Sequence, residues 1–401
     1  MQVNHQEHHP PKGDSLSFDN TEIAFRNKSN AELNKAYWLF KIISINILTK
    51  IGPPVTNFAI KMGLPITGII RATIFKHFCG GETIADSEKA IAQLAAGKVG
   101  TILDYSVEGE EEELVFDETC AEVIRTIERA KGDQRIPLTV FKLTGIARFA
   151  LLEKLDAKKS LNFEEKQEFE RVKDRVKRIC SRAAELEVPV MIDAEESWIQ
   201  ETIDELALEM MRLYNRKKLL IYNTYQLYRH DKLADLKADM ATAKKEGFIL
   251  GAKLVRGAYM EKERKRAAEM GYLSPIQPDK ESSDRDYDLA VKACMQQLDH
   301  VGFVAGTHNE NSCRLLADLL DQQGVEHQHP HVFFSQLLGM SDNLSFNLSN
   351  AGYNVAKYVP YGPVKAVLPY LFRRAQENTS IAGQMGRELG LILKEKRRRG
   401  I

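Results

Sequence analysis

From about residue 97 onward, short apolar runs alternate regularly with longer charged stretches. The apolar runs do not alternate with polar residues, which is typical of strands buried on both faces of a parallel sheet. The charged stretches, such as 164–184 and 233–245, have the length and pattern of amphipathic helices. Eight strands are predicted, at Val99–Tyr105, Leu138–Leu143, Val190–Ala194, Leu219–Thr224, Leu250–Val255, Phe303–Thr307, Val332–Gln336 and Val355–Val359.

This alternation over about 300 residues matches a closed (β/α)8 barrel, an α/β fold of the TIM-like kind. A doubly wound parallel sheet is the alternative, because it also alternates strands with helices. The chain of 401 residues accommodates the barrel and an N-terminal extension. We expect residues 1–20 to form a disordered tail, residues 21–97 a helical region and residues 98–401 the barrel.

Apolar residues are dense within the predicted helical region. Asn30 is expected to cap its first long helix, and the residues from Trp38 to Ile43 are too apolar for a helix with one solvated face. This region either packs on the barrel or, through Trp38–Ile51, docks to a membrane surface or a partner. Lysines at 41, 50 and 61 interrupt the apolar stretch, so no membrane span is expected.

The charge balance and the cysteine pattern exclude some functions. Lys and Arg together number 56, as do Asp and Glu, so the net charge is zero and no basic field points to a nucleic acid. The five cysteines form no CxxC pair, which favours a reducing compartment over a disulfide framework. The polar N-terminus has no apolar core of a signal peptide, so none is expected.

Ionisable residues follow the predicted strands at the ends where barrel enzymes place their active sites. Lys142 ends the second strand and Asp193 the third. Since neighbouring strand ends meet, the two side chains are expected to pair, either in a functional site or as a structural ion pair.

The fifth strand carries two cations, Lys253 and Arg256, followed by the small residues Gly257 and Ala258. Cations beside small residues suit a flat anionic ligand or a pyrophosphate. No GxGxxG turn follows the first strand and no GxxxxGK[ST] loop is present, so a dinucleotide would not be held by those motifs.

The segment Tyr370–Asn378 is predicted to be a helix with chemistry on one face. Tyr370, Arg373, Arg374 and Glu377 are spaced i, i+3, i+4 and i+7. Two arginines beside a tyrosine can form a multi-donor clamp for a carboxylate. The alternative is a solvated helix in which Arg373 pairs with Glu377.

His327, His329 and His331 form an HxHxH pattern, which in a strand would place three metal-ligating groups on one face. Pro330 disfavours strand pairing there, and the apolar run begins only after His331. The triplet would then lie at the N-terminal end of the seventh strand, away from the catalytic face. A surface cluster is favoured, and a metal-dependent barrel hydrolase is kept as a second functional hypothesis.

Five motifs occur in order along the chain: Lys142-Leu-Thr, Asp193-Ala-Glu-Glu196, Lys253-Leu-Val-Arg-Gly-Ala-Tyr259, Thr307-His-Asn309 and Tyr370-Leu-Phe-Arg-Arg-Ala-Gln-Glu-Asn378. Together they resemble the proline dehydrogenase family. The resemblance implies an FAD-dependent (β/α)8 barrel without a metal ion. Such an enzyme oxidises L-proline to Δ1-pyrroline-5-carboxylate in the first step of proline catabolism, by hydride transfer to flavin N5, and passes the electrons to a quinone.

The same resemblance assigns roles to residues of this chain. Arg373 and Arg374, assisted by Lys142, would bind the carboxylate of proline, and Asp193 would order the ionic network. The ring of proline would be walled by Tyr259, Leu337 or Leu338, Tyr358 and Tyr370. FAD would be held by Asn223, Gln226, Lys253, Arg256, Gly257, Ala258, Thr307, His308, Asn309 and Glu377. The tyrosine at 358 favours proline over hydroxyproline, and a hydroxyproline-preferring dehydrogenase is the alternative within the family.

Partners and location are also implied by the resemblance. The chain has no room for the aldehyde dehydrogenase domain of bifunctional relatives, so a separate pyrroline-5-carboxylate dehydrogenase is expected downstream. A quinone acceptor implies peripheral membrane contact through the N-terminal apolar segment or the basic residues Lys394–Arg399. Residues 1–30 lack the composition of a transit peptide, which favours the cytoplasm and the cytoplasmic face of the inner membrane; a eukaryotic source would imply the mitochondrion.

Overall fold

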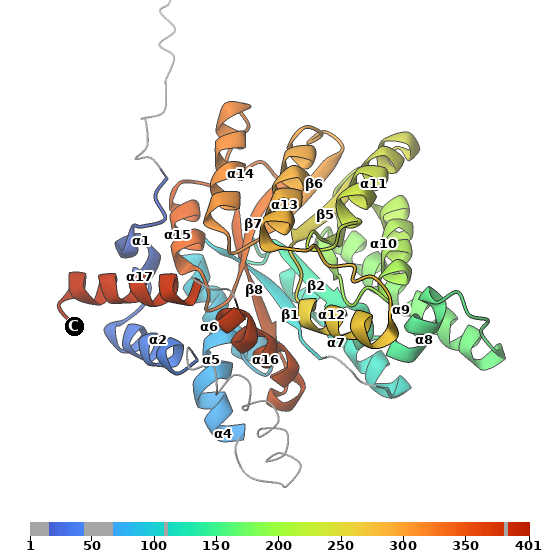
Figure 1. Ribbon diagram of the computed structural model, residues 1–401, viewed down its shortest axis with the longest axis horizontal. Coiled ribbons are helices and arrows are strands. Elements are labelled where there is room, and N and C mark those ends of the chain that lie inside the picture. The colour runs from blue at the N-terminus through green and yellow to red at the C-terminus, as the bar shows by residue number, and fades with distance from the viewer. Residues whose placement is uncertain (1–15, 44–66, 108–110, 381–383) are drawn as a thin grey trace, which may run out of the picture.

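The computed structural model describes residues 16–43, 67–107, 111–380 and 384–401 (Figure 1). Most of the predicted N-terminal tail and part of the apolar segment after Trp38 lie outside these ranges. Figure 1 shows a ring of helices around a central set of strands, with α1, α2 and α17 grouped together on one side.

The strands form a closed barrel in which each strand pairs in parallel with the next along the chain and β8 pairs with β1. The fold is therefore the predicted (β/α)8 barrel and not the doubly wound sheet. The strands are β1 Gly100–Tyr105, β2 Leu138–Lys142, β3 Val190–Asp193, β4 Ile221–Gln226, β5 Leu250–Val255, β6 Val301–Gly306, β7 Val332–Leu337 and β8 Val355–Tyr361.

The fourth strand begins two residues later than predicted, at Ile221 and not Leu219. The cause is Asn215 at the end of the preceding helix. Its Oδ1 accepts the backbone N–H groups of Leu220 (3.0 Å) and Ile221 (2.8 Å), which holds the connection in a turn until the strand begins. Propensity alone does not reveal this, because Leu219 and Leu220 are as apolar as a strand residue.

The helices that follow the strands form the outer layer of the barrel, and the predicted helices at 164–184 and 233–245 are present as α9 and α11. The bounds are α7 Glu113–Ala130, α8 Phe149–Asp156, α9 Phe163–Leu186, α10 Gln200–Tyr214, α11 Lys232–Glu246, α12 Met260–Met270, α13 Lys280–Met295, α14 Glu310–Gln322, α15 Asp342–Asn350, α16 Val364–Ser380 and α17 Gln384–Arg399. A short 3-10 segment, η2, spans Leu143–Gly145.

The region before the barrel is helical where the structure describes it. Its elements are α1 Thr21–Phe25, α2 Asn30–Ile43, α4 Thr67–Ile70, a π-helical segment η1 Arg71–Phe75, α5 Lys76–Phe78 and α6 Ile84–Ala96. The predicted cap of α2 is wrong by one residue. Ser29, not Asn30, is the cap: its hydroxyl accepts the N–H of Glu32 (3.2 Å), whose carboxylate accepts the N–H of Ser29 (2.9 Å).

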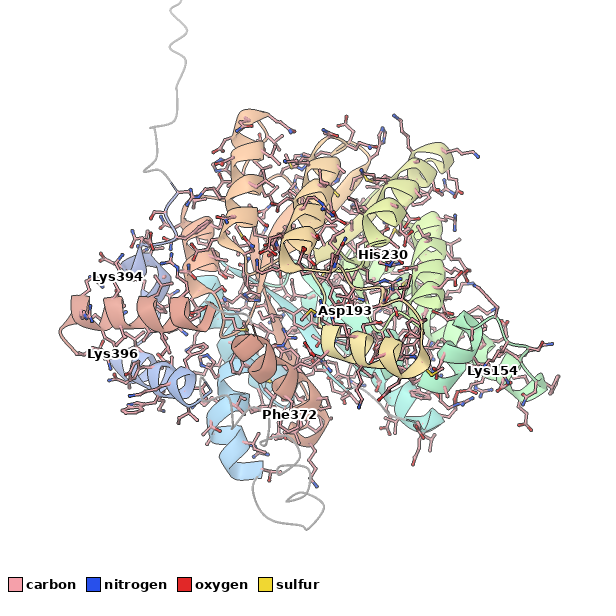
Figure 2. The ribbon with its side chains drawn as sticks, in the orientation of Figure 1. Lys154, Asp193, His230, Phe372, Lys394 and Lys396 are labelled. Atoms are coloured by element: carbon pink, nitrogen blue, oxygen red, sulfur yellow. The ribbon has the colours of Figure 1, made fainter. Side chains whose placement is uncertain are left out.

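The first helices pack against the last one. Phe25, Leu33 and Phe40 form a buried apolar cluster with Leu391 and Ile392 of α17. Lys394 donates to the backbone oxygen of Asp19 (2.7 Å) on one side of α17, and Lys396 lies over the ring of Tyr37 on the other (Figure 2). Helices α1 and α2 near the start of the chain therefore pack against α17 at its end, beside the barrel.

The barrel interior decides which residues reach the site. Side chains alternate along a strand, and a buried apolar cluster marks the inward-facing set. Its members are Ile102, Leu138, Val140, Met191, Leu219, Tyr222, Val304, Ala356 and Tyr358. Counting in steps of two from Ile102, Val140 and Met191 places Asp104, Lys142 and Asp193 inside the barrel. Lys253 of β5 points to the same interior, because its ammonium group contacts Asp193.

Candidate active site

Asp193 stands at the centre of a buried ionic network at the carboxyl end of the barrel (Figure 2). Its Oδ1 accepts from Lys253 Nζ at 2.5 Å, and its Oδ2 accepts from Lys142 Nζ at 3.3 Å. The hydroxyl of Tyr358 donates to the same Oδ2 at 2.8 Å. The four side chains come from β2, β3, β5 and β8, and each is at most 9% exposed. The predicted pairing of Lys142 with Asp193 is confirmed.

Charge around Asp193 fixes its protonation. Burial alone would raise the pKa of this carboxyl group, but the ammonium groups of Lys253 and Lys142 outweigh burial and lower the pKa to about 2. Asp193 is therefore ionised throughout the neutral range. The two lysines are in turn held by a fixed negative charge, which offsets the cost of burying them.

Asp104 is a member of this network that sequence reasoning does not assign. It is fully buried at the end of β1, and its Oδ2 lies 3.7 Å from Lys142 Nζ. Ser106 donates to the same oxygen. Burial raises the pKa of Asp104 above its usual value, whereas the pKa of Asp193 is lowered. A signal was available in the sequence, because Asp104 is two residues after Ile102 and so shares its inward face.

Aromatic side chains border the network. The ammonium groups of Lys253 and Lys142 lie 4.8 Å and 5.7 Å from the ring centre of Tyr358, within the range of a cation–π contact. Leu337, at the end of β7, packs against the interior cluster that includes Tyr358. These two predicted wall residues therefore share the mouth of the barrel with the charged groups.

Helix α16 carries the predicted clamp residues. Tyr370 is 5% exposed and packs in an apolar cluster with Phe75, Phe78 and Met340. The guanidinium carbon of Arg374 lies 5.2 Å from the ring centre of Tyr370, and that of Arg373 lies 5.4 Å from the ring centre of Tyr259.

The structure thus brings both arginines together with two of the predicted wall tyrosines. Glu377 belongs to α16, but its side chain is outside the described part of the chain. The predicted pair of Arg373 with Glu377 is therefore not tested.

Arg256, after β5, is fixed by four neighbours. Its guanidinium group donates to Asp284 (2.6 Å), Thr307 (2.7 Å) and Ser312 (3.0 Å) and lies 4.3 Å from the ring centre of Tyr287. Asp284, Tyr287 and Ser312 are additions to the predicted residues, and they come from α13 and α14, the helices flanking β6. Because its partners surround it, Arg256 is held ready for an anionic group without reorganisation.

The residues beside Arg256 fit the pyrophosphate of a dinucleotide such as FAD. Gly257 has φ of +134°, and a Cβ there would come within 2.4 Å of the Tyr228 ring, so the backbone at 257 requires glycine and presents no side chain. Asn309 caps α14 by accepting the N–H groups of Asn311 (2.9 Å) and Ser312 (3.1 Å). A guanidinium group, a bare stretch of backbone and the positive end of a helix suit a phosphate.

The strand-four residues separate into two environments. Asn223 is fully buried and its amide donates to Asp204 of α10 (2.8 Å), on the outer side of the barrel. Gln226, at the end of β4, donates to the backbone oxygen of Glu195 (2.7 Å) in the connection after β3. Of the two, Gln226 lies with the other candidate residues and Asn223 does not.

His308 follows β6 beside Thr307. Its Nδ1 lies 2.9 Å from the hydroxyl of Ser341, and the N–H of Leu337 donates to its Nε2 at 3.5 Å. Burial and the nearby charges of Lys357, Arg374 and Arg256 lower the pKa of His308 to about 3. The imidazole is therefore neutral, with the proton on Nδ1.

The histidine triplet lies before β7, at the opposite end of the barrel from the ionic network. His327 contacts Asp321 (2.7 Å) and the backbone oxygen of Ala351 (3.0 Å), and His331 contacts the backbone oxygen of Leu298 (2.9 Å). Within the described residues, no group of three or more His, Cys, Asp or Glu side chains is placed to hold a metal ion. The three rings serve as local hydrogen-bonding groups at the base of the barrel.

Several known proteins are similar to this chain. Residues 87–387 match the family model of proline dehydrogenase. Proline dehydrogenase 1, mitochondrial, from Dictyostelium discoideum is 32% identical, over 96% of this chain and 75% of the relative. The human protein of the same name is 42% identical, over 59% of this chain and 40% of the relative. The carbapenem antibiotics biosynthesis protein CarD from Pectobacterium carotovorum is 33% identical, over 83% of this chain and 86% of the relative.

The fold also has solved counterparts. Proline utilization A from Bdellovibrio bacteriovorus, inactivated by N-propargylglycine, superimposes with a TM-score of 0.70 at 20% sequence identity, over 92% of this chain and 37% of that one. The chain thus spans about a third of such solved structures and about two fifths of the human relative. The family match, the curated relatives and the closed barrel lead to one conclusion: this chain belongs to the proline dehydrogenase family, a family of oxidoreductases.

Proposed function

We propose that this protein oxidises L-proline to Δ1-pyrroline-5-carboxylate with FAD as cofactor, in the first step of proline catabolism, and that its electrons pass to a quinone. The observation that carries the proposal is the barrel mouth itself. There, the ammonium groups of Lys142 and Lys253 flank the ionised Asp193, and helix α16 sets two arginines against the rings of Tyr259 and Tyr370. Such a site suits a small apolar ring that bears one carboxylate.

Each group in the mouth has a role in holding proline. Arg373 and Arg374 bind the carboxylate, because a guanidinium group presents paired donors that match it. Asp193 keeps Lys142 and Lys253 in place, so that positive charge is organised before the substrate arrives. Tyr358, Tyr259, Tyr370 and Leu337 enclose the ring and limit the entry of water.

FAD, when bound, accepts the hydride that leaves the carbon next to the proline nitrogen. Arg256, Gly257 and the residues after β6 would hold its pyrophosphate, for the reasons of charge and backbone access given above. Lys253 contributes positive charge from the neighbouring strand end. The chain's own contribution is orientation of the two reactants and the exclusion of solvent.

A quinone acceptor places part of the protein at a membrane surface. No helix in the described ranges is long and apolar enough to cross a membrane. Trp38 and Ile42 of α2 are 56% and 51% exposed, and Arg397 of α17 is exposed as well, which supports peripheral contact through this side of the molecule.

The compartment is then an inner-membrane face in a bacterium or the mitochondrion in a eukaryote, and several relatives are named mitochondrial. The product passes to a separate pyrroline-5-carboxylate dehydrogenase.

The test is purification followed by an absorbance spectrum and anaerobic addition of proline. Bound flavin that is bleached by L-proline is the expected result. Arg374→Met should retain flavin but lose at least about 30-fold in kcat/KM for proline, because a desolvated charge partner is removed. Arg178→Met, on the exposed face of α9, is the matched control and should behave as the wild type. A protein that takes up no flavin, or that ignores proline, would refute the proposal.

A further inference from the structure

The turn between β7 and α15, residues 338–341, is held by groups from three other parts of the chain. Lys357 of β8 donates to the backbone oxygens of Met340 (2.5 Å) and Leu337 (3.2 Å), and His77 of α5 contacts the oxygen of Gly339 (2.9 Å). Ser341 has φ of +50°, a left-handed conformation that is costly for a residue with a side chain. A turn of this shape persists only where its surroundings fix it.

Both ends of the described chain contribute to that fixation. Asp342, directly after the turn, is bridged by Lys357 (2.9 Å) and by Lys28 (2.8 Å), which lies between α1 and α2. Glu388 of α17 accepts the backbone N–H of Ser341. Glu388 is 5% exposed, so its carboxylate reaches the turn through the protein interior and not across the surface.

The turn at 338–341 also contacts His308. The hydroxyl of Ser341 lies 2.9 Å from His308 Nδ1, and the N–H of Leu337 donates to Nε2. One ring nitrogen is therefore occupied by Ser341, which Glu388 supports, and the other by Leu337, the last residue of β7. The ring cannot rotate without breaking one of these two contacts, and His308 is one of the residues that would hold FAD.

We propose that Glu388 is a positioning residue for flavin binding: by fixing Ser341 it orients the imidazole of His308, so that the C-terminal helix α17 forms part of the cofactor-binding machinery. The inference rests on the proposed function, because it assigns His308 to the FAD side of the mouth. It adds a residue from a helix that follows the last β/α unit and that carries none of the recognisable motifs.

Shortening Glu388 is predicted to release the Ser341 N–H from its partner while it stays buried. The left-handed turn then loses a buried hydrogen bond, and His308 gains freedom. The effect should therefore appear in flavin retention. Flavin retention should depend on the acceptor oxygen more than on the charge. Glutamine keeps an acceptor oxygen at the same distance along the side chain, so Glu388→Gln should retain most of the flavin.

The experiment measures the first-order rate of FAD release from the purified holoenzyme after dilution, by the rise in free-flavin fluorescence. Glu388→Ala should release FAD about tenfold faster than the wild type or more, and Glu388→Gln should stay within about threefold of it. Ser341→Ala removes only the hydroxyl and should reproduce the fast release. In a His308→Ala background, Ser341→Ala should have no additional effect on the release rate, because Ser341 acts on the cofactor only through the imidazole of His308.

Glu395→Gln is the matched control. Glu395 lies on α17 seven residues after Glu388, is fully buried and pairs with Arg398 and Arg399 of its own helix. A general loosening of α17 would affect Glu395→Gln and Glu388→Ala alike, whereas the proposal expects fast release from the latter alone. Wild-type rates for both Glu388→Ala and Ser341→Ala would refute the inference and leave the proposed function intact. A wild-type protein without flavin would refute both.

Discussion

At the residue scale, the site depends on how the carboxylate of Asp193 is shared. Oδ1 faces Lys253, while Oδ2 receives Lys142 and the Tyr358 hydroxyl. One buried negative charge therefore organises two buried cations and one phenol. The arrangement is stable when all of its members are present. Removal of the carboxylate costs free energy of folding, because a lone ammonium group in the interior has neither water nor a counter-charge.

Asp193→Asn tests this dependence. The two lysines lose their common counter-charge while remaining buried, so the free energy of unfolding should fall by about 3–5 kcal/mol. Urea denaturation of the holoenzyme at pH 7 measures the loss, and the KM for proline should rise in parallel as the lysines rearrange. Glu187→Gln is the control, since the pair of Glu187 with Lys218 is more than half exposed and should contribute less than about 1 kcal/mol. Equal losses in the two variants would contradict the central role of Asp193.

At the scale of the element, the turn from β5 to α12 shows how a backbone conformation prepares a binding surface. Arg256 and Tyr259 lie on either side of the small residues Gly257 and Ala258, so the turn places a cation and an aromatic ring next to a stretch with little side chain. The positive φ of Gly257 achieves this. The nearby Tyr228 ring leaves no room for a side chain, so conformation and packing both require glycine at this position.

Gly257→Ala should therefore disturb the cofactor side of the site more than it disturbs folding. The added methyl group forces the Tyr228 ring and the turn apart, and we expect flavin content after purification to fall severalfold. Gly271→Ala is the matched control. Gly271 ends α12 with φ of +75°, so alanine there is also strained, but no atom lies within 4 Å of its added Cβ. If both variants lost flavin equally, backbone strain alone would explain the effect and the role given to the turn would be wrong.

At the scale of the whole molecule, what the sequence predicts depends on how local the cause is. The barrel follows from the strand pattern, and the pair Lys142–Asp193 follows from strand order, because the register places the two residues opposite one another. The contact of Lys253 with Asp193 joins β5 to β3 across the interior and depends on barrel closure. The partners that hold Arg256 are set by single hydrogen bonds, and so is the choice of Ser29 over Asn30 as the cap of α2. No periodic pattern encodes such bonds.

The terminal segments are the clearest case of a cause that acts over the whole chain. Lys28 and Glu388 lie 360 residues apart in sequence, and both act on the same turn and its neighbour Asp342. Neither resembles a functional residue in its local sequence. Their role arises only because α1, α2 and α17 pack together beside the barrel (Figure 1).

This arrangement predicts a specific pH dependence of stability. Burial and the charge of Asp342 raise the pKa of Glu388 to about 7, while the Ser341 N–H, Lys357 and Lys28 act in the opposite direction. A carboxyl group whose pKa is higher in the folded state keeps its proton on folding, so its stabilising contribution is present below about pH 4.5 and is lost as pH rises through about 7. Glu388→Gln cannot titrate and should not show this loss.

The difference in free energy of unfolding between Glu388→Gln and the wild type should therefore rise in favour of the variant between pH 5 and 8. The rise should be up to about 1.4 kcal/mol per pH unit. Subtracting the two urea-derived curves cancels the other groups in the cluster, including His77 and His308, which both variants retain. Glu395 supplies the contrast on the same helix, because Arg398 and Arg399 outweigh burial and lower its pKa to about 2. The difference between Glu395→Gln and the wild type should then be flat over this range, and parallel curves for Glu388→Gln and the wild type would show that Glu388 is ionised throughout.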